Sequence, residues 1–218
     1  MTSISSISSV TLDVADLPEA ESFYSAAFGL GDRLRLRASD APSTGFRGFT
    51  LSLLVAQPAT AAAFLDAALA AGATEIKPAK KSLWGFGGTV QAPDGTLWKV
   101  ATSAKKDSGP ATREIDALVL LIAAADVAAS KRFYADRGLA VGKSFGKYVE
   151  FALPSSPVGF GLYSRSALAK DAGVAPEGSG SHRLAVNSDA GAFTDPDGFA
   201  WEAVAAATGA GADSAAAA

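Results

Sequence analysis

Two stretches of the chain share one order of apolar and polar positions. Each begins with an apolar segment, VTLDV or LVLLI, and continues through an aspartate into an amphipathic segment that holds a Phe-Tyr pair. Apolar positions that alternate with polar ones indicate a strand, whereas apolar positions three or four residues apart indicate a helix. Asp16 can cap the first helix, and Asp126 has the same place in the second stretch. We therefore predict a strand followed by a helix in both stretches.

The same two stretches end on a shared motif. PDGTLWK at residues 93–99 and PDGFAWE at residues 196–202 both have Pro-Asp-Gly and then, after two residues, tryptophan. Because the opening and closing motifs keep one register, we interpret the chain as two tandem units. The segments are a first unit in residues 1–105, a polar linker in 106–113, a second unit in 114–206 and a low-complexity, disordered tail in 207–218.

The composition narrows the class of protein without indicating a ligand. Hydrophobic residues make up 49% and charged residues 19% of the chain, which is typical of a globular protein. The formal net charge of −3 gives no indication of a nucleic-acid or membrane partner. The absence of cysteine excludes disulfides, thiol nucleophiles and thiolate metal sites. The segment MTSISSISSV lacks a signal-peptide pattern and the apolar runs are too short to span a bilayer, so we expect a cytoplasmic protein.

The repeated motifs carry a family resemblance. They are the strand-Asp-helix-Phe-Tyr-Gly-Leu opening and the segment KPAKKSLWGFGGTVQAPDGTLWK at residues 77–99. Together they resemble the vicinal oxygen chelate superfamily, which includes glyoxalase-like enzymes, bleomycin-resistance proteins and extradiol dioxygenases. The resemblance covers residues 10–204. It implies an α+β fold in which tandem βαβββ modules form curved mixed or antiparallel sheets, with helices outside and a half-open cup between paired modules.

Both units depart from the pattern of this superfamily. The first unit passes from RLRLRAS almost directly to GFTLSLLVA, so its first module is short of one or two strands. The second unit has no counterpart of the helix and strand expected in residues 58–78. Since the two deletions are complementary, we expect the units to pack together and to cover each other's open sheet edges. The alternative is two independently trimmed domains with a small contact.

Superfamily members that use a metal place His, Gln or Glu ligands on the first and last strands of each module. The resemblance carries these positions onto Ser9, Thr50 and Lys99 in the first unit, and onto Ala117, Tyr163, His182 and Glu202 in the second. A lysine ammonium has no lone pair for a metal, so we expect no metal in the first unit. Lys99 is then a rim lysine, or it pairs with an acidic group or an anionic ligand.

His182 and Glu202 are the two good metal ligands among the positions in the second unit. They can hold a weakly bound divalent metal, form a hydrogen-bonded structural pair, or act as general acid and base. Ala117 argues against the metal, because the resemblance places a strong ligand there. We therefore favour a protein without a metal or other cofactor, with a divalent metal at His182 and Glu202 as the alternative.

Aromatic residues supply the other candidate binding groups. Trp84 and Phe86 are the preferred wall of the cup, because the loop that holds them runs over the cup in the superfamily. The further candidates on expected strands are Phe49, Tyr148 and Tyr163. For each of them, ordinary packing in the core or at the rim is the alternative. Trp98 and Trp201 have the opposite strand parity, so we expect them to pack under helices.

Three functions are compatible with these features. The favoured one is metal-independent binding of a small, aromatic molecule, in the manner of sequestration by a bleomycin-resistance protein. The alternative is a glyoxalase-like lyase or isomerase, or a dioxygenase, with a site around His182 and Glu202. The third is an interaction domain with a filled cup. We expect a small-molecule ligand as partner, with a homodimer as one option for assembly.

Overall fold

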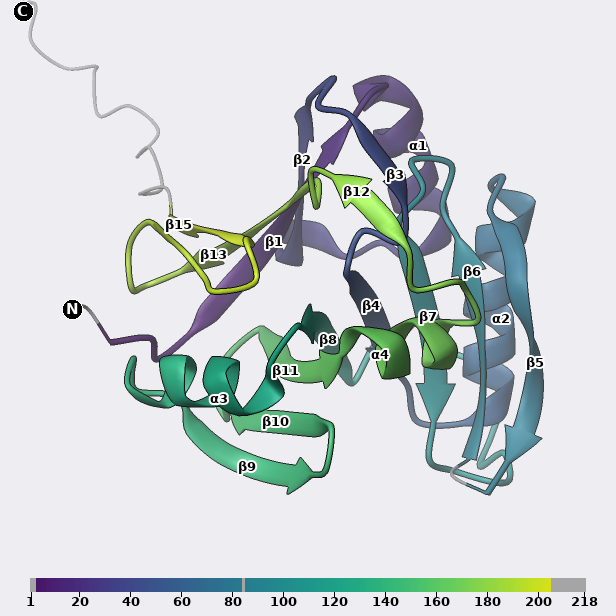
Figure 1. Cartoon of the computed structure of the whole chain (residues 1–218). Helices are drawn as coiled ribbons and strands as arrows, with labels where there is room; N and C mark the ends of the chain where they lie inside the picture. The colour runs from purple at the N-terminus through teal and green to yellow at the C-terminus, as the bar shows by residue number, and fades with distance from the viewer. Residues whose placement is uncertain (1–2, 84, 205–218) are drawn as a thin grey trace, which may run out of the picture.

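The computed structural model describes residues 3–83 and 85–204, which form a mixed α+β fold (Figure 1). The strands make an eight-stranded sheet, a five-stranded sheet and a two-stranded sheet. The expected fold class is confirmed. The tail in residues 207–218 lies outside the described residues. No helix within the described residues has the length and apolar character that crossing a membrane requires.

The eight-stranded sheet contains two complete βαβββ modules. In spatial order its strands are β5 (Thr74–Ser82), β6 (Gly85–Gln91), β7 (Leu97–Thr102), β4 (Phe49–Leu54), β8 (Ala117–Ala124), β11 (Val158–Ser164), β10 (Tyr148–Ala152) and β9 (Ala140–Phe145). Helix α2 (Pro58–Ala70) follows β4, and helix α3 (Val127–Ala135) follows β8. The modules meet where β4 and β8 pair antiparallel, from Phe49 opposite Ile122 to Leu54 opposite Ala117.

The five-stranded sheet contains two trimmed modules. In spatial order its strands are β14 (Phe193–Thr194), β15 (Ala200–Ala203), β13 (Leu184–Ser188), β1 (Ile7–Val14) and β2 (Leu34–Ala38). Helix α1 (Leu17–Ala27) and the 3-10 turn η1 (Gly31–Arg33) connect β1 to β2. The modules meet where β1 and β13 pair antiparallel. The remaining elements are the two-stranded sheet of β3 (Ser43–Gly45) and β12 (Gly178–Gly180), and helix α4 (Arg165–Ala172) after β11.

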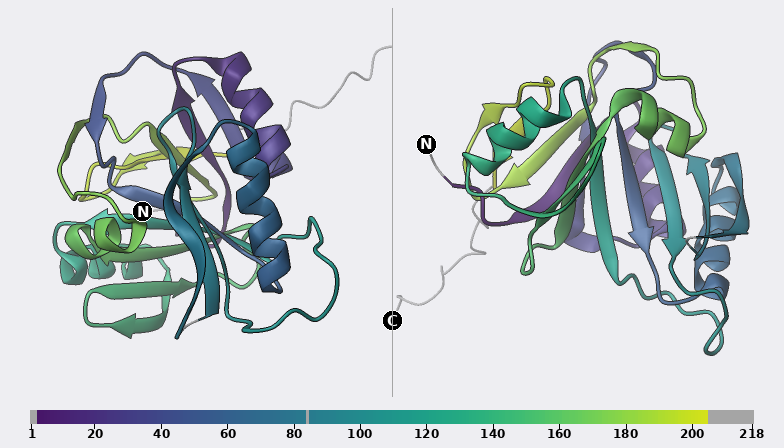
Figure 2. Two further views of the ribbon diagram at one scale, coloured as in Figure 1. Left: turned by 90° about the vertical axis from the view of Figure 1, so that its right-hand side faces the viewer. Right: turned by 60° about the horizontal axis from the view of Figure 1, so that its bottom comes forward.

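Each large sheet therefore takes strands from both predicted units. The complete modules pair with each other, and the trimmed modules pair with each other. Figure 2 shows the result, with the purple strand β1 beside the yellow-green strand β13 although they lie far apart in the sequence. The expected packing of the two units is present, but it arises by exchange of modules between units, not by one unit covering the edges of the other.

The capping aspartates explain where the helices begin. The Asp16 side chain accepts a hydrogen bond from the backbone N–H of Glu19 at 2.9 Å. Asp126 accepts hydrogen bonds from Ala128 and Ala129 at 2.9 and 3.0 Å. These bonds satisfy backbone donors that the first helical turn leaves without partners. The predicted strand-to-helix junctions are thus confirmed at both places.

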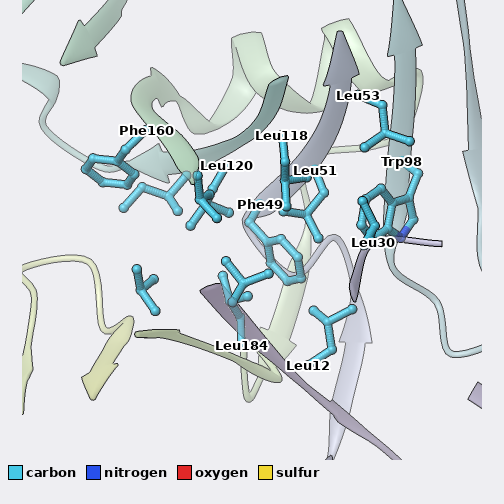
Figure 3. Close-up of a cluster of buried hydrophobic side chains, with 14 of the residues drawn as sticks. Leu12, Leu30, Phe49, Leu51, Leu53, Trp98, Leu118, Leu120, Phe160 and Leu184 are labelled. Atoms are coloured by element: carbon cyan, nitrogen blue, oxygen red, sulfur yellow. The ribbon is translucent and has the colours of Figure 1, made fainter. Parts of the chain in front are cut away.

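One hydrophobic core joins the two large sheets (Figure 3). Leu12 and Leu184 contribute from the five-stranded sheet, and Phe49, Leu51 and Leu120 contribute from the eight-stranded sheet. All of them are buried. Because this shared core uses one face of the eight-stranded sheet, the opposite face is left for other side chains.

The two repeated tryptophans support helices from equivalent positions. Trp98 on β7 packs against Phe28 at the end of α1, with ring centroids 4.7 Å apart. Trp201 on β15 packs against Tyr134 of α3, with centroids 5.5 Å apart. Both tryptophans are fully buried. The parity argument, which placed them on the side of the helices, is confirmed.

Candidate functional site

A cavity of about 910 Å³ lies on the face of the eight-stranded sheet opposite the shared core. Strand alternation makes this face. On β4, Ser52 and Leu54 line the cavity, whereas Leu51 is buried in the core. On β8, Val119 and Leu121 line the cavity while their neighbours are buried. The cavity is therefore built from the second face of both complete modules.

One row of side chains crosses the middle of this face. Thr89 is opposite Lys99, Lys99 opposite Ser52, Ser52 opposite Val119, and Val119 opposite Gly159. Ser52, and not the expected Thr50, is thus the β4 residue beside Lys99.

The donor atoms of this row do not fit a divalent metal. Hydroxyl groups, an ammonium and an apolar side chain replace the carboxylate, imidazole and carbonyl ligands that such ions prefer. Within residues 3–83 and 85–204, no group of three or more His, Asp or Glu side chains lies close enough to share a metal.

Lys99 forms an ion pair in the lining of the cavity. Its ammonium lies 2.8 and 3.1 Å from the two carboxylate oxygens of Asp171 on α4. Both side chains line the cavity and are about one-third exposed. Pairing with an acidic group was one of the alternatives for Lys99, and the structure shows that Asp171 is the group.

Helix α4 covers part of the cavity face. Its residues Leu168, Ala169 and Ala172 are buried in a small apolar cluster with Leu97 and Ala123, which belong to β7 and β8. Burial of this apolar face keeps α4 against the sheet. The helix therefore forms a wall of the cavity and leaves the remainder of the face open.

Two tyrosines and a carboxylate mark the opposite end of the cavity. The rings of Tyr148 and Tyr163 are 5.4 Å apart and nearly perpendicular, at 80°. The Tyr148 hydroxyl donates to Glu150 at 3.2 Å, and the Lys143 ammonium lies 3.5 Å from the same carboxylate. Burial and the adjacent Glu150 charge raise the pKa of Tyr148 to about 12. Tyr148 is thus a neutral donor with an accessible ring.

The aromatic candidates divide between the cavity and the core. Tyr148 and Tyr163 line the cavity. Phe49 is only 2% exposed and belongs to the shared core, so its proposed role in the cavity wall was wrong. Phe86 also packs against the core, on the opposite face from the cavity residue Lys99. Trp84 lies outside the described residues.

On the five-stranded sheet, the equivalent face carries buried polar side chains in place of a cavity. Asn187 is opposite Ser9 on one side and Glu202 on the other. The Asn187 amide donates to the hydroxyls of Ser9 and Thr11 at 3.1 and 2.8 Å. The three residues that share these hydrogen bonds are buried. The face is therefore filled by a hydrogen-bonded polar layer.

An arginine extends across this polar layer. Arg37 on the edge strand β2 donates to Asp13 at 2.6 Å and to Glu202 at 2.9 Å. These hydrogen bonds raise the pKa of Arg37. Glu202 is consequently engaged by a guanidinium, whose positive charge disfavours a metal ion at the same carboxylate.

The hydrogen-bonded pair of His182 and Glu202, one of the alternatives for these residues, is not formed. The His182 nitrogens lie 2.5 Å from the carbonyl oxygen of Arg47 and 3.1 Å from that of Asp197. Its ring also stacks on Phe199, with centroids 3.8 Å apart. Of the alternatives for His182, the structural role agrees with these contacts, but its partners are backbone carbonyls and a phenyl ring.

Sequence reasoning did not identify Asp171, Glu150 and Lys143 as cavity residues. Asp171 is on α4, a short helix that was not predicted, although Gly173 in the left-handed conformation gives it a standard end. Glu150 lies on β10, two residues after the candidate Tyr148, and Lys143 lies on the neighbouring strand β9. A period-of-two pattern alone identifies the faces of a strand without indicating which face borders a cavity.

Comparisons with known proteins agree with this architecture. No family model matches the chain, and no curated protein matches it. Glyoxalase I from Zea mays is similar in structure, with a TM-score of 0.61 and 12% identity over 90% of each chain. A putative dioxygenase from Bacillus subtilis subsp. subtilis str. 168 is similar with a TM-score of 0.53 and 13% identity, over 90% of this chain and 73% of that one. The chain thus shares its fold with glyoxalase I and with this putative dioxygenase.

Proposed function

We propose that the protein binds a small, partly aromatic molecule in the cavity of the eight-stranded sheet, without a metal. The observation that carries the proposal is the composition of the central row of the cavity. The row holds Thr89, Lys99, Ser52 and Val119, whose hydroxyl, ammonium and apolar groups include no His, Asp or Glu side chain. Sequestration of the ligand, with no bond made or broken, is the function that this row supports.

The size and lining of the cavity suit such a ligand. A volume of about 910 Å³ lies within the range of drug-sized binding sites. Leu54, Ala101, Val119 and Leu121 supply apolar surface, and Gly159 leaves the floor open beside Val119. Tyr148 and Tyr163 offer rings at one end for edge-to-face or stacked contact with an aromatic ligand.

The alternative of a lyase, an isomerase or a dioxygenase at His182 and Glu202 receives no support from their contacts. His182 lies between two backbone carbonyls, and Glu202 is bound by Arg37. A general base or a metal ligand needs a lone pair that its other partners do not occupy.

A fluorescence titration with N-phenyl-1-naphthylamine, a neutral aromatic probe that brightens in apolar surroundings, tests the proposal. We expect saturable binding to the unmodified protein. Val119→Phe places a ring in the middle of the cavity and should weaken binding at least about tenfold, which corresponds to roughly 1.4 kcal/mol.

The matched control is Val141→Phe, the same substitution on the exposed edge strand β9 and outside the cavity lining. It should leave binding unchanged. Absence of saturable binding, or equal loss in the two variants, would show that the cavity is not the binding site.

A further inference from the structure

We propose that the ligand carries a positive charge close to its aromatic part, and that Glu150 and Asp171 together set this preference. The inference rests on the proposed function, because it concerns the ligand of the same cavity. Four charged side chains line the cavity, two of each sign: Lys99, Asp171, Lys143 and Glu150. Their formal charges cancel, so any preference depends on how tightly each pair is held.

The pair of Lys99 and Asp171 is closed. The ammonium contacts both oxygens of one carboxylate, at 2.8 and 3.1 Å. An anionic ligand would have to displace Asp171 to reach Lys99. The positive charge of Lys99 is therefore already paired with Asp171 within the protein.

Contacts from a second lysine hold Asp171 in this place. The ammonium of Lys77 on β5 donates to the backbone carbonyls of Lys170 and Asp171, at 2.8 and 2.6 Å. These carbonyls are at the C-terminal end of α4, where a cation is stabilising. The aliphatic part of Lys77 lies against Gly173, because a Cβ there would be 2.7 Å from Lys77 Cε. Displacing Asp171 would disturb this arrangement as well as the ion pair.

The pair of Lys143 and Glu150 is open by comparison. The ammonium is 3.5 Å from the carboxylate, and the Lys143 side chain is 65% exposed on an edge strand. Exposed pairs of this kind contribute little free energy. A cationic group of a ligand can thus replace Lys143 at Glu150, and Lys143 can turn into solvent.

The surroundings of Glu150 match the chemistry that recognises cations. Tyr148 and Tyr163, on neighbouring strands, present two rings at 80° beside the carboxylate. Aromatic faces attract cations through the ring quadrupole, and a nearby carboxylate adds to this attraction. Leu121, which packs over Gly161 opposite Glu150, supplies apolar surface of the cavity for the apolar part of the ligand.

The two charged pairs are far enough apart to act separately. Lys99 is on β7 and Glu150 is on β10, four strand spacings apart in the order of the sheet. At about 4.8 Å per spacing this is roughly 19 Å along the sheet, and less across its curve. A ligand with one aromatic ring and one cation therefore reaches Glu150 without disturbing Asp171.

Calorimetric titration with three probes of matched shape tests the inference. They are 4-phenylbutylamine, 4-phenylbutan-1-ol and 4-phenylbutanoate, which are cationic, neutral and anionic at pH 7. For the unmodified protein we expect the amine to bind about tenfold more tightly than the alcohol, and the carboxylate to bind more weakly than both. Glu150→Gln should reduce the affinity for the amine to that for the alcohol.

Two further variants make the result independent of how well Glu150→Gln folds. Lys143→Ala removes the exposed competitor and should raise the affinity for the amine severalfold relative to the alcohol. Asp171→Asn releases Lys99 and should raise the affinity for the carboxylate about tenfold relative to the alcohol.

The outcomes separate this inference from the proposed function. If all three probes bind with equal affinity to the unmodified protein and its variants, the charge preference is wrong and the aromatic-binding function stands. If the carboxylate binds most tightly to the unmodified protein, the inference is also wrong. If no probe binds, the proposed function falls, and the inference falls with it.

Discussion

The two large sheets are both built from two paired modules, but one sheet has a cavity on its second face and the other sheet has that face filled. In both, two modules meet through antiparallel first strands, β4 with β8 and β1 with β13. The eight-stranded sheet keeps a cavity on its second face, whereas the five-stranded sheet fills the equivalent face with Asn187, its hydroxyl partners and Arg37. Pairing of first strands alone therefore does not create a binding site.

The difference follows from what each module retains. Complete modules add strands on both sides of the central pair, so the sheet is wide enough to curve around a volume. In the trimmed modules, β2 is an edge strand beside β1, and Arg37 reaches from it to Glu202 on β15. A narrow sheet can thus be spanned by one long side chain, and that side chain closes the space where a ligand would bind.

The largest expected effect is a loss of stability when either of the two equivalent tryptophans, one on each large sheet, is removed. Trp98→Ala and Trp201→Ala each remove a fully buried ring and should lower the free energy of unfolding by about 3–5 kcal/mol. Denaturant unfolding, followed by circular dichroism, measures the loss. Because one core joins the sheets, each variant should still unfold in a single transition. Two separated transitions would show that the sheets are independent.

A smaller effect is expected from the ion pairs on the two second faces. Arg37→Ala leaves Asp13 and Glu202 without their shared cation and should cost up to about 1 kcal/mol, because the Arg37 side chain is 47% exposed. Lys99→Ala removes a single pair and should cost less.

Thermal melting at low salt and at 1 M NaCl checks the order of these two effects. The difference should shrink at high salt, where exposed charges are screened. A greater loss for Lys99→Ala than for Arg37→Ala would contradict the view that the five-stranded sheet is the more dependent on its ion pairs.

The smallest effect is spectroscopic and concerns the cavity alone. The phenol of Tyr148 should ionise at about pH 12, and Glu150→Gln should lower that pKa toward 10 by removing the adjacent charge. Because the pKa of Tyr148 is higher in the folded state than in the unfolded state, Tyr148 contributes its full share to the free energy of unfolding below pH 10. That contribution is lost as the pH rises through about 12. Absorbance titration near 295 nm, with Tyr148→Phe to assign the step, measures it. If the pKa of Tyr148 is unchanged in Glu150→Gln, Glu150 does not contribute to the raised pKa.

The sequence predicted the parts of the molecule that local patterns determine. Asp16 as a helix cap and the orientation of Trp98 and Trp201 follow from residues near each other in the chain, and the structure confirms them. The division into units at residues 105 and 114 stays a prediction. Which modules pair could not be predicted, because either pairing buries the same alternating apolar positions.

The candidate site was predicted less well for the same reason. Tyr148, Tyr163 and Lys99 were identified and line the cavity, but the partner of Lys99 lies 72 residues further along the chain. Phe49 was misplaced because an aromatic residue on a strand suits a core and a binding face equally. The position of Asp171 depends on α4 packing across β7 and β8, a contact between segments that no local pattern connects.

The exchange of modules between the two halves has a consequence for biosynthesis. Strand β1 pairs with β13, in a register that places Ile7 opposite Ser188. During translation, β1 leaves the ribosome well before β13 and lacks this antiparallel partner until nearly the whole of the described chain has been made. Such long-range pairing slows folding and leaves apolar strands exposed to other chains in the interval. The edge of β1 that pairs with β13 therefore stays open until β13 has been made.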